Sequence, residues 1–240
     1  TDIVTLFDLP VFSRNHERAM QQILRYVETK QKALVYFVNA HTVNTAKQRP
    51  DFLEVLQGAD LLLPDGIGLE LAARMKGSCF EENLCGTDFI EYLCVAELKL
   101  YLLGGTPGTA ERAGEVFHKR WGGQIVGVHH GFILNRLEME QAVCEDIRAC
   151  QPDVVLVGFG VPLQEEWCAR FRTQLDCPIL MGVGGLFDYY SGNVKRAPLL
   201  WRKARIEWVY RLMQEPGRLW KRYLLGNVEF LWHSWRDRGS

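Results

Sequence analysis

The chain has 240 residues, of which 48% are hydrophobic, and its formal net charge is −1. This length and composition allow one large domain, or one domain with an appendage. A near-neutral net charge argues against general nucleic-acid binding. No apolar run reaches the roughly 18 residues of a membrane-spanning helix, and the first residues lack the pattern of a signal peptide. We therefore expect neither a spanning helix nor secretion.

The charge is unevenly distributed along the chain. Residues 195–240 hold 11 of the 28 Lys and Arg, 4 of the 29 Asp and Glu, and five of the seven Trp. The residues before them carry 17 basic and 25 acidic side chains, a net charge of −8. A basic, Trp-rich segment is typical of contact with an anionic membrane surface. We predict a catalytic core over 1–194 and a membrane-docking appendage over 195–240; alternatively, these Trp pack on the core or on another subunit.

Short apolar runs alternate with longer amphipathic segments over most of the chain. Continuous runs rich in Val, Leu and Ile suit parallel strands that are covered on both faces. In chain order, we expect strands at 33–38, 60–63, 100–103, 124–128, 154–157 and 178–182, and helices at 17–28, 51–57, 87–97, 109–121, 138–150, 164–173, 206–214 and 219–235. This alternation predicts an α/β fold with helices on both faces of a mostly parallel sheet, joined by right-handed crossovers.

Glycines or polar residues follow the end of nearly every predicted strand. The turns contain Asn39, Asp65, Gly104, Gly105, Gly158, Gly160, Gly184 and Gly185. In an open parallel sheet they gather at the carboxyl edge, where such folds bind ligands, and glycine lets the backbone approach a phosphate. GxGxxG with a downstream acidic residue is absent, as is GxxxxGK[ST], which makes a nicotinamide dehydrogenase a weak candidate and removes the P-loop enzymes.

Several side chains at these turns have both a functional and a structural interpretation. Asp65 can act as a general base or cap the following helix. Asn39 can cap a helix or offer its amide to a sugar or base. Gln164 can contact a ligand or be simply exposed. The pair Lys195 and Arg196 is either a solvated surface or a clamp for an anion.

Metal and thiol chemistry is not expected from the sequence. The seven cysteines have no CxxC spacing, so we interpret them as reduced thiols and predict no metal site and no cofactor. Transferases that use a divalent metal for a diphosphate leaving group commonly hold it on a DxD motif, and the sequence has none. Helix N-termini and Lys or Arg side chains would then have to neutralise a diphosphate.

The motifs, taken together, resemble the WecG/TagA/CpsF glycosyltransferases from about Val4 to the end of the chain. The segments that carry the resemblance are Asn39-Ala40, Pro64-Asp65-Gly66, Leu102-Leu103-Gly104-Gly105, His130-Gly131-Phe132, Gly158-Phe159-Gly160-Val161-Pro162-Leu163-Gln164-Glu165, Gly182-Val183-Gly184-Gly185-Leu186-Phe187-Asp188, Gly192-Asn193-Val194-Lys195-Arg196-Ala197-Pro198, Glu207-Trp208-Val209-Tyr210-Arg211-Leu212 and Gln214-Glu215-Pro216-Gly217-Arg218. They occur in the family's order.

The resemblance implies a Rossmann-like core and a C-terminal appendage that docks on the membrane and completes the site. It implies inverting, metal-independent transfer from a UDP-sugar donor to a polyprenyl-diphosphate-linked sugar acceptor, at the cytoplasmic face of a bacterial membrane. Asp65 matches the family's proposed base. Asn39 and Gln164 match donor-contacting positions. Three tail arginines match positions near the diphosphate: Arg211, Arg218 and Arg222.

The sequence departs from the family pattern at two positions, and two other functions remain as alternatives. Asn83 stands where many members have an arginine, and Phe37 stands where some have a hydroxyl residue, so the resemblance does not name the donor sugar. A nucleotide-binding or dehydrogenase-like module would also fit the α/β pattern. A non-catalytic membrane adaptor would fit the tail, but it leaves the decorated strand ends unexplained. Exposed apolar tail surface would favour a homo-oligomer when no membrane is present.

Overall fold

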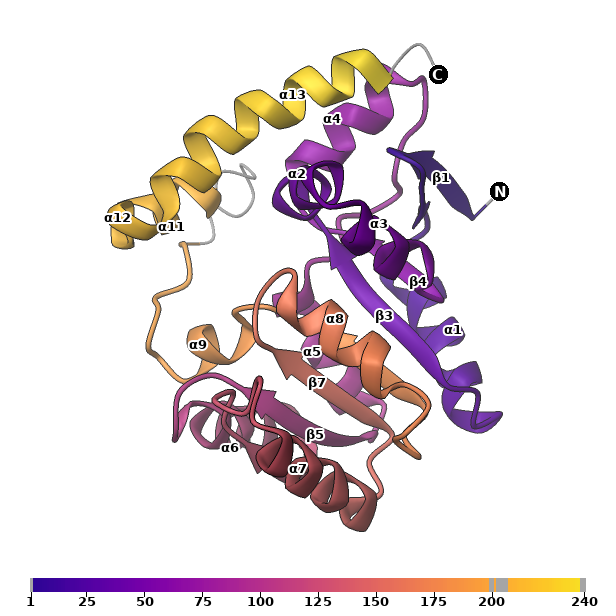
Figure 1. Cartoon of the computed structure of the whole chain (residues 1–240), viewed down its shortest axis with the longest axis vertical. Helices are drawn as coiled ribbons and strands as arrows, with labels where there is room; N and C mark the ends of the chain where they lie inside the picture. The colour runs from indigo at the N-terminus through magenta and orange to yellow at the C-terminus, as the bar shows by residue number, and fades with distance from the viewer. Residues whose placement is uncertain (1, 199–200, 202–206, 238–240) are drawn as a thin grey trace.

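The computed structural model describes residues 2–198, 201 and 207–237, except for the side chain of Arg218. Its centre is an eight-stranded sheet with the order β1-β2-β4-β3-β8-β7-β5-β6 (Figure 1). All neighbouring strands are parallel except β1 and β2, which form an antiparallel hairpin. The predicted α/β class with a mostly parallel sheet is confirmed.

The strands that form the middle of the sheet are almost entirely buried. They are β3 (Ala33–Val38), β4 (Leu61–Pro64), β8 (Ile179–Gly182), β7 (Val154–Gly158) and β5 (Lys99–Gly104). The edge strand β6 (Gln124–His129) is only partly covered. Continuous burial follows from helices on both faces, because each side chain of a middle strand then meets a helix whichever way it points.

Two layers of helices cover the sheet, and each layer has its own hydrophobic core. One layer, in front of the sheet in Figure 1, contains α2 (Ala40–Gln48), α3 (Pro50–Gln57), α4 (Ile67–Met75), α7 (Leu137–Cys150) and α8 (Leu163–Phe171). The other layer contains α1 (His16–Glu28), α5 (Gly86–Val95), α6 (Thr109–Trp121) and α9 (Leu186–Tyr190).

The N-terminal hairpin and three helices of the body differ from the sequence prediction. Strands β1 (Ile3–Leu6) and β2 (Leu9–Phe12) were not expected, because their turn is made by Phe7 and Asp8, which lack the glycine of a typical two-residue hairpin. Both turn residues nevertheless have positive φ angles, of 55° and 65°. Helices α2, α4 and α9 are absent from the helix ranges expected from the pattern, although a helix after Asn39 and one after Asp65 were considered as capping alternatives.

The tail is helical, and its last helix packs on two of the front helices. It contains α11 (Glu207–Gln214), α12 (Pro216–Trp220), a π-helical turn η1 (Lys221–Leu225) and α13 (Gly226–Asp237). Helix α13 lies across α2 and α4 (Figure 1). Buried Phe230 meets the Phe7 ring at 5.4 Å between centroids, and Asn44 Nδ2 donates to the Gly226 carbonyl at 2.7 Å. The predicted helical appendage is therefore present, and its α13 is anchored to the body.

Candidate active site

The glycine-rich and polar turns lie along one edge of the sheet, outside the carboxyl ends of its strands. The connections lead to opposite sides of the sheet from β5 and β7, because β5 continues through α6 to β6 on one side and β7 continues through α8 to β8 on the other. Ligands of open α/β sheets bind at such a switch point. The turns contact each other closely there: a Cβ added to Gly104 would lie 2.6 Å from the Gly158 carbonyl oxygen. Gly104 therefore has to be glycine, and it also has a φ of 151°.

Asn39 and Asp65 lie side by side at the ends of the paired strands β3 and β4. Asn39 caps α2, since its Oδ1 accepts from the N–H groups of His41 and Thr42 at 3.0 and 3.2 Å. Its Nδ2 points the other way and donates to Asp65 Oδ2 at 3.4 Å. Asp65 does not cap α4, whose N-cap is Gly66. The capping interpretation thus holds for Asn39 and is wrong for Asp65.

The Asp65 carboxyl lies in a mixed electrostatic environment. Burial raises its pKa above the usual value of an aspartate. Hydrogen bonds from Asn39 and from the Cys85 thiol oppose that rise, as do the positive charges of Arg222 and Arg211. A carboxylate with a raised proton affinity and nearby cations is suited to accept a proton. Cys85 has no catalytic motif around it, so sequence reasoning missed it.

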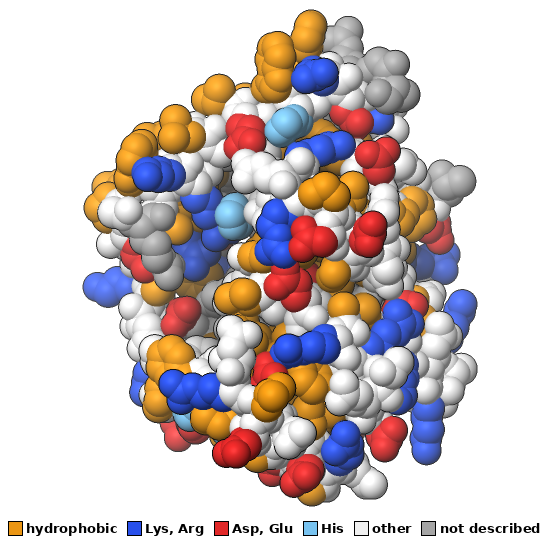
Figure 2. Space-filling view, in the orientation of Figure 1, with side chains coloured by type: hydrophobic (Ala, Val, Ile, Leu, Met, Phe, Trp, Pro, Cys, Tyr) orange, Lys and Arg blue, Asp and Glu red, His pale blue; other side chains and the backbone are white. Residues whose placement is uncertain are grey.

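Two of the predicted tail arginines lie at this edge. A Cβ added to Gly185 would lie 2.8 Å from Arg211 Nη2, so this guanidinium covers the turn after β8. It also lies 5.0 Å from the centroid of the Tyr189 ring. Arg222, in η1, is close enough to His41 to help lower the pKa of that imidazole to about 4, together with burial, the larger cause. Figure 2 shows Lys and Arg side chains gathered where the tail helices face the body.

The other predicted cations are placed differently. Arg196 pairs with Asp88 at 2.6 Å and with Glu207 at 3.6 Å, so its charge is partly neutralised within the protein. Lys195 is exposed, and its backbone N–H and C=O bond to the Gln214 side chain at 3.1 and 2.8 Å. The Arg218 side chain lies outside the described part of the structure.

Gln164 is buried, with 3% of its surface exposed, so the alternative of a simply exposed side chain is wrong. Its Oε1 accepts from Gly160 N at 3.1 Å and from Gly184 N at 2.9 Å. One amide oxygen therefore ties the turn after β7 to the turn after β8. Because both N–H groups already have an acceptor, Gly160 and Gly184 can serve a ligand through the shape of their turns rather than through these two donors.

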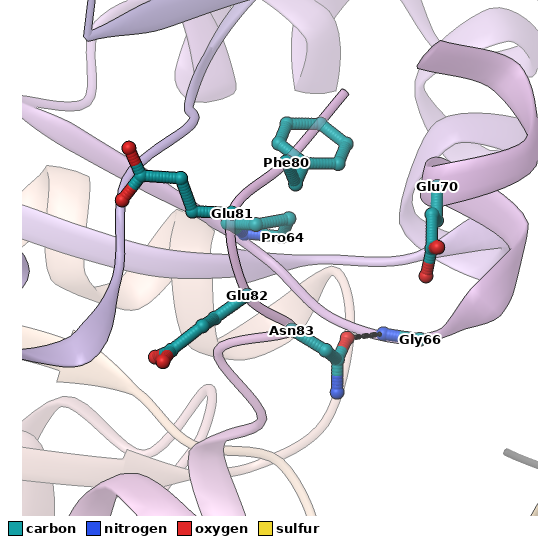
Figure 3. Close-up of a pocket in the computed structure, with 7 residues that line it drawn as sticks. All are labelled: Pro64, Gly66, Glu70, Phe80, Glu81, Glu82 and Asn83. Atoms are coloured by element: carbon teal, nitrogen blue, oxygen red, sulfur yellow. Dashed lines mark hydrogen bonds between the residues drawn. The ribbon is translucent and has the colours of Figure 1, made fainter. Parts of the chain in front are cut away.

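A small pocket lies beside the turn after β4, and Asn83, one of the two family departures, lines it. Figure 3 shows its lining residues, Pro64, Gly66, Glu70, Phe80, Glu81, Glu82 and Asn83. Asn83 Oδ1 accepts from the Gly66 N–H, which holds the turn after β4, where Gly66 has a φ of 92°. Phe37 is buried and packs against Phe89 at 5.9 Å between ring centroids. Three glutamates make the pocket unsuitable for a diphosphate.

Three properties of the described residues concern disulfides, metal binding and membrane spanning. All seven cysteines are free thiols. Within residues 2–198, 201 and 207–237, no three His, Cys, Asp or Glu side chains come together as a metal site. Across the same residues, every helix is too short or too polar to cross a bilayer.

Comparisons with known proteins agree with the motifs. A model of the glycosyl transferase WecG/TagA/CpsF family matches residues 4–240. An N-acetylglucosaminyldiphosphoundecaprenol N-acetyl-beta-D-mannosaminyltransferase of Bacillus subtilis is 30% identical over 226 residues, which cover 92% of this chain and 86% of that protein. Proteins of the same name from Bacillus spizizenii and Staphylococcus aureus are each 33% identical, over 83% and 77% of this chain and 77% and 71% of their own lengths. The resemblance is confirmed, and the chain belongs to the WecG/TagA/CpsF family of glycosyltransferases.

Proposed function

We propose that the chain transfers a sugar from a UDP-sugar to a sugar carried on undecaprenyl diphosphate, with inversion at the anomeric carbon and without a metal ion. One observation carries the proposal. The Asp65 carboxyl, at the ligand-binding edge of the sheet, is held by Asn39 and faces the positive charge of Arg211 and Arg222. This arrangement supports the proposal, because a carboxyl can accept a proton and cations beside it can receive a diphosphate.

The proposed reaction is a direct displacement. Asp65 takes the proton of the acceptor hydroxyl as the hydroxyl oxygen attacks the anomeric carbon. The bond between that carbon and the UDP oxygen breaks, and UDP leaves with the electron pair. Arg211 lies over the Gly185 turn, where it can stabilise the charge that develops on the leaving diphosphate. Attack from the face opposite to UDP inverts the configuration.

The named relatives suggest which substrates to test first. Three relatives carry a name in which N-acetylmannosamine is transferred to N-acetylglucosaminyldiphosphoundecaprenol. We propose the same acceptor class for this chain. UDP-N-acetylmannosamine is therefore the first donor to test. A panel of other UDP-sugars is tested beside it, because Asn83 and Phe37 depart from residues found in many or some members of the family.

We further propose that the tail binds the cytoplasmic face of an anionic membrane, where the lipid-linked acceptor resides. Its helices expose several large apolar side chains: Met213, Trp220, Leu224, Leu225, Val228, Leu231, Trp232 and Trp235. Figure 2 shows hydrophobic side chains along the outer rim of these helices. Apolar side chains with Lys and Arg around them suit an anionic lipid interface. Without lipid, the same surface would favour a homo-oligomer, which sedimentation with and without detergent would detect.

The function is tested by measuring UDP release from each UDP-sugar, with a short-chain polyprenyl-diphosphate N-acetylglucosamine acceptor and with EDTA present. We expect acceptor-dependent release from one donor. Asp65→Asn should lower kcat by about 10²–10⁴-fold, the range for removing a positioned base. Asp8→Asn is the matched control, because Asp8 is exposed and asparagine tolerates its positive φ.

Three results would count against parts of this proposal. Full activity of Asp65→Asn would remove the base but leave the transferase. Loss of activity in EDTA, restored by a divalent metal, would contradict metal independence. Silence across the donor panel, combined with tight NAD binding, would favour the dehydrogenase-like alternative.

A further inference from the structure

A buried carboxyl next to Gln164 has no place in the reaction described above. Glu165 is fully buried on α8, and its Oε1 accepts from Gln164 Nε2 at 2.8 Å. Its Oε2 is buried and accepts no hydrogen bond from the described residues. The Tyr36 hydroxyl donates to the Glu165 backbone carbonyl at 3.1 Å, which fixes this turn of the helix against β3. Burying a carboxyl is costly, so its retention calls for a reason.

The Gln164 amide has only one useful orientation. Its two neighbours on the strand side are N–H donors, those of Gly160 and Gly184, and they require the amide oxygen. Its neighbour on the helix side is the Glu165 carboxylate, which accepts hydrogen bonds and therefore requires the NH₂ group. Rotation of the amide by 180° would place NH₂ against two donors and oxygen against a carboxylate. Glu165 thus adds a third interaction that favours the orientation in which the amide oxygen holds both turns.

We propose that Glu165 is a positioning residue for donor binding: it orients the Gln164 amide, which in turn fixes the relative placement of the Gly160 and Gly184 turns. The inference rests on the proposed function for the identity of the ligand at those turns. Gly182 lies directly under the same amide, since a Cβ there would be 2.9 Å from Gln164 Nε2. Gly182, the two glycine turns and the Glu165 carboxylate therefore surround the Gln164 amide group.

The electrostatics of Glu165 agree with this role. Burial raises the pKa of Glu165 to about 7, while the hydrogen bond from Gln164 opposes that rise. Three titratable groups lie close to this carboxyl: Glu166 and the Cys168 thiol on its own helix, and the Tyr36 phenol of β3. The hydrogen bond from Gln164 is one of the two hydrogen bonds that lower this pKa and so favour the charged carboxylate.

The test compares Glu165→Met, which keeps the volume but removes the acceptor, with Glu165→Gln, which keeps a carbonyl acceptor. Hydrogen exchange is measured in peptides that cover 158–163 and 182–186, and donor KM and kcat are measured in the UDP-release assay. We expect Glu165→Met to speed exchange in both peptides and to raise donor KM about tenfold with kcat little changed. Glu165→Gln should restore slow exchange and low KM. Glu166→Gln, on the same helix, is the control.

A double-mutant comparison tests whether Glu165 acts through Gln164. Gln164→Met should reproduce the effect of Glu165→Met, and combining the two should add little, because both remove the same tie. Unchanged exchange in both peptides in Glu165→Met would overturn the inference, as would equal losses in Glu165→Met and Glu165→Gln. Additive effects in the double variant would also overturn it. Exchange is read without turnover, so an inactive wild type would refute the proposed function and still leave this result decisive.

Discussion

Truncating Phe230 should separate the tail from the body without touching the site. Phe230 is 1% exposed, packs on Phe7, and lies against Gly68, where an added Cβ would be 3.3 Å from its ring. Replacing a buried phenylalanine by alanine costs about 3–5 kcal/mol. The polar anchors that remain are hydrogen bonds or ion pairs worth about 0.5–1.5 kcal/mol each. They join α13 to Asn44, Gln48, Lys76 and Phe7.

A loss of 3 kcal/mol shifts the ratio of docked to undocked tail more than a hundredfold, since each 1.4 kcal/mol is about tenfold. Arg211 and Arg222 would then leave the Asp65 edge for much of the time. We expect Phe230→Ala to lower kcat/KM for the donor at least tenfold in detergent, with protease cleavage appearing first in the tail.

The neighbouring residue supplies the control for this experiment. Leu231 is 47% exposed on the same helix, so Leu231→Ala should change kcat/KM in detergent by less than about twofold. Activity of Phe230→Ala within twofold of the wild type, with the substitution confirmed, would refute the argument that this contact holds the arginines in place. Simultaneous unfolding of the body would show that the tail is not a separable layer.

Three further predictions follow from the charges and the exposed surface. Arg222→Met should lower kcat/KM about tenfold or more and move the acidic limb of the pH–rate profile to higher pH. In the wild type, the positive charge of Arg222 lowers the pKa of Asp65, and the variant loses that charge. His41→Gln should remove a stability loss of up to about 3 kcal/mol between pH 6.5 and 4. The double variant Trp232→Ser and Trp235→Ser should bind anionic liposomes at least about tenfold more weakly.

The measurements for these three are pH–rate profiles, thermal unfolding at a series of pH values, and liposome co-sedimentation. The sign for His41 follows from its lowered pKa: the unfolded imidazole binds a proton below about pH 6.5, while the folded one stays neutral until about pH 4. Its stabilising effect is complete above pH 6.5 and is lost as the pH falls. An acidic limb that stays in place would contradict the prediction for Arg222. A pH dependence of stability equal to that of the wild type would contradict the prediction for His41. Unchanged liposome binding would contradict the prediction for Trp232 and Trp235.

The parallel strands and the edge that carries the site could be predicted, because both depend on local pattern. A run such as Val154–Gly158 is apolar throughout since it is covered on both faces, and the residues after it must then turn at the carboxyl edge. The hairpin before residue 13 could not be predicted in the same way. Its turn residues Phe7 and Asp8 adopt positive φ through tertiary packing, with Phe7 buried under Phe230, rather than through turn chemistry.

The contacts that give the site its chemistry could not be predicted, because they join distant parts of the chain. Nothing near Arg211 in the sequence indicates Gly185, and nothing near Asp65 indicates the Cys85 thiol. Gln164 shows the same limit at short range. Its position at the start of a helix indicates either a ligand contact or exposure, whereas its buried amide bonds two turns that are 24 residues apart in sequence, at Gly160 and Gly184.

Under the proposed function, the tail contributes to catalysis, because the base lies on the body whereas the cations beside it lie on the tail. Asp65 belongs to the acidic body, where burial alone raises its pKa, and the opposing positive charges of Arg222 and Arg211 arrive on the tail. The same tail exposes Trp232 and Trp235 on its outer surface. A lipid contact that steadies the tail would therefore also steady the cations at the diphosphate site. Turnover would then be coupled to the presence of the membrane that carries the acceptor, with no need for a separate regulatory domain.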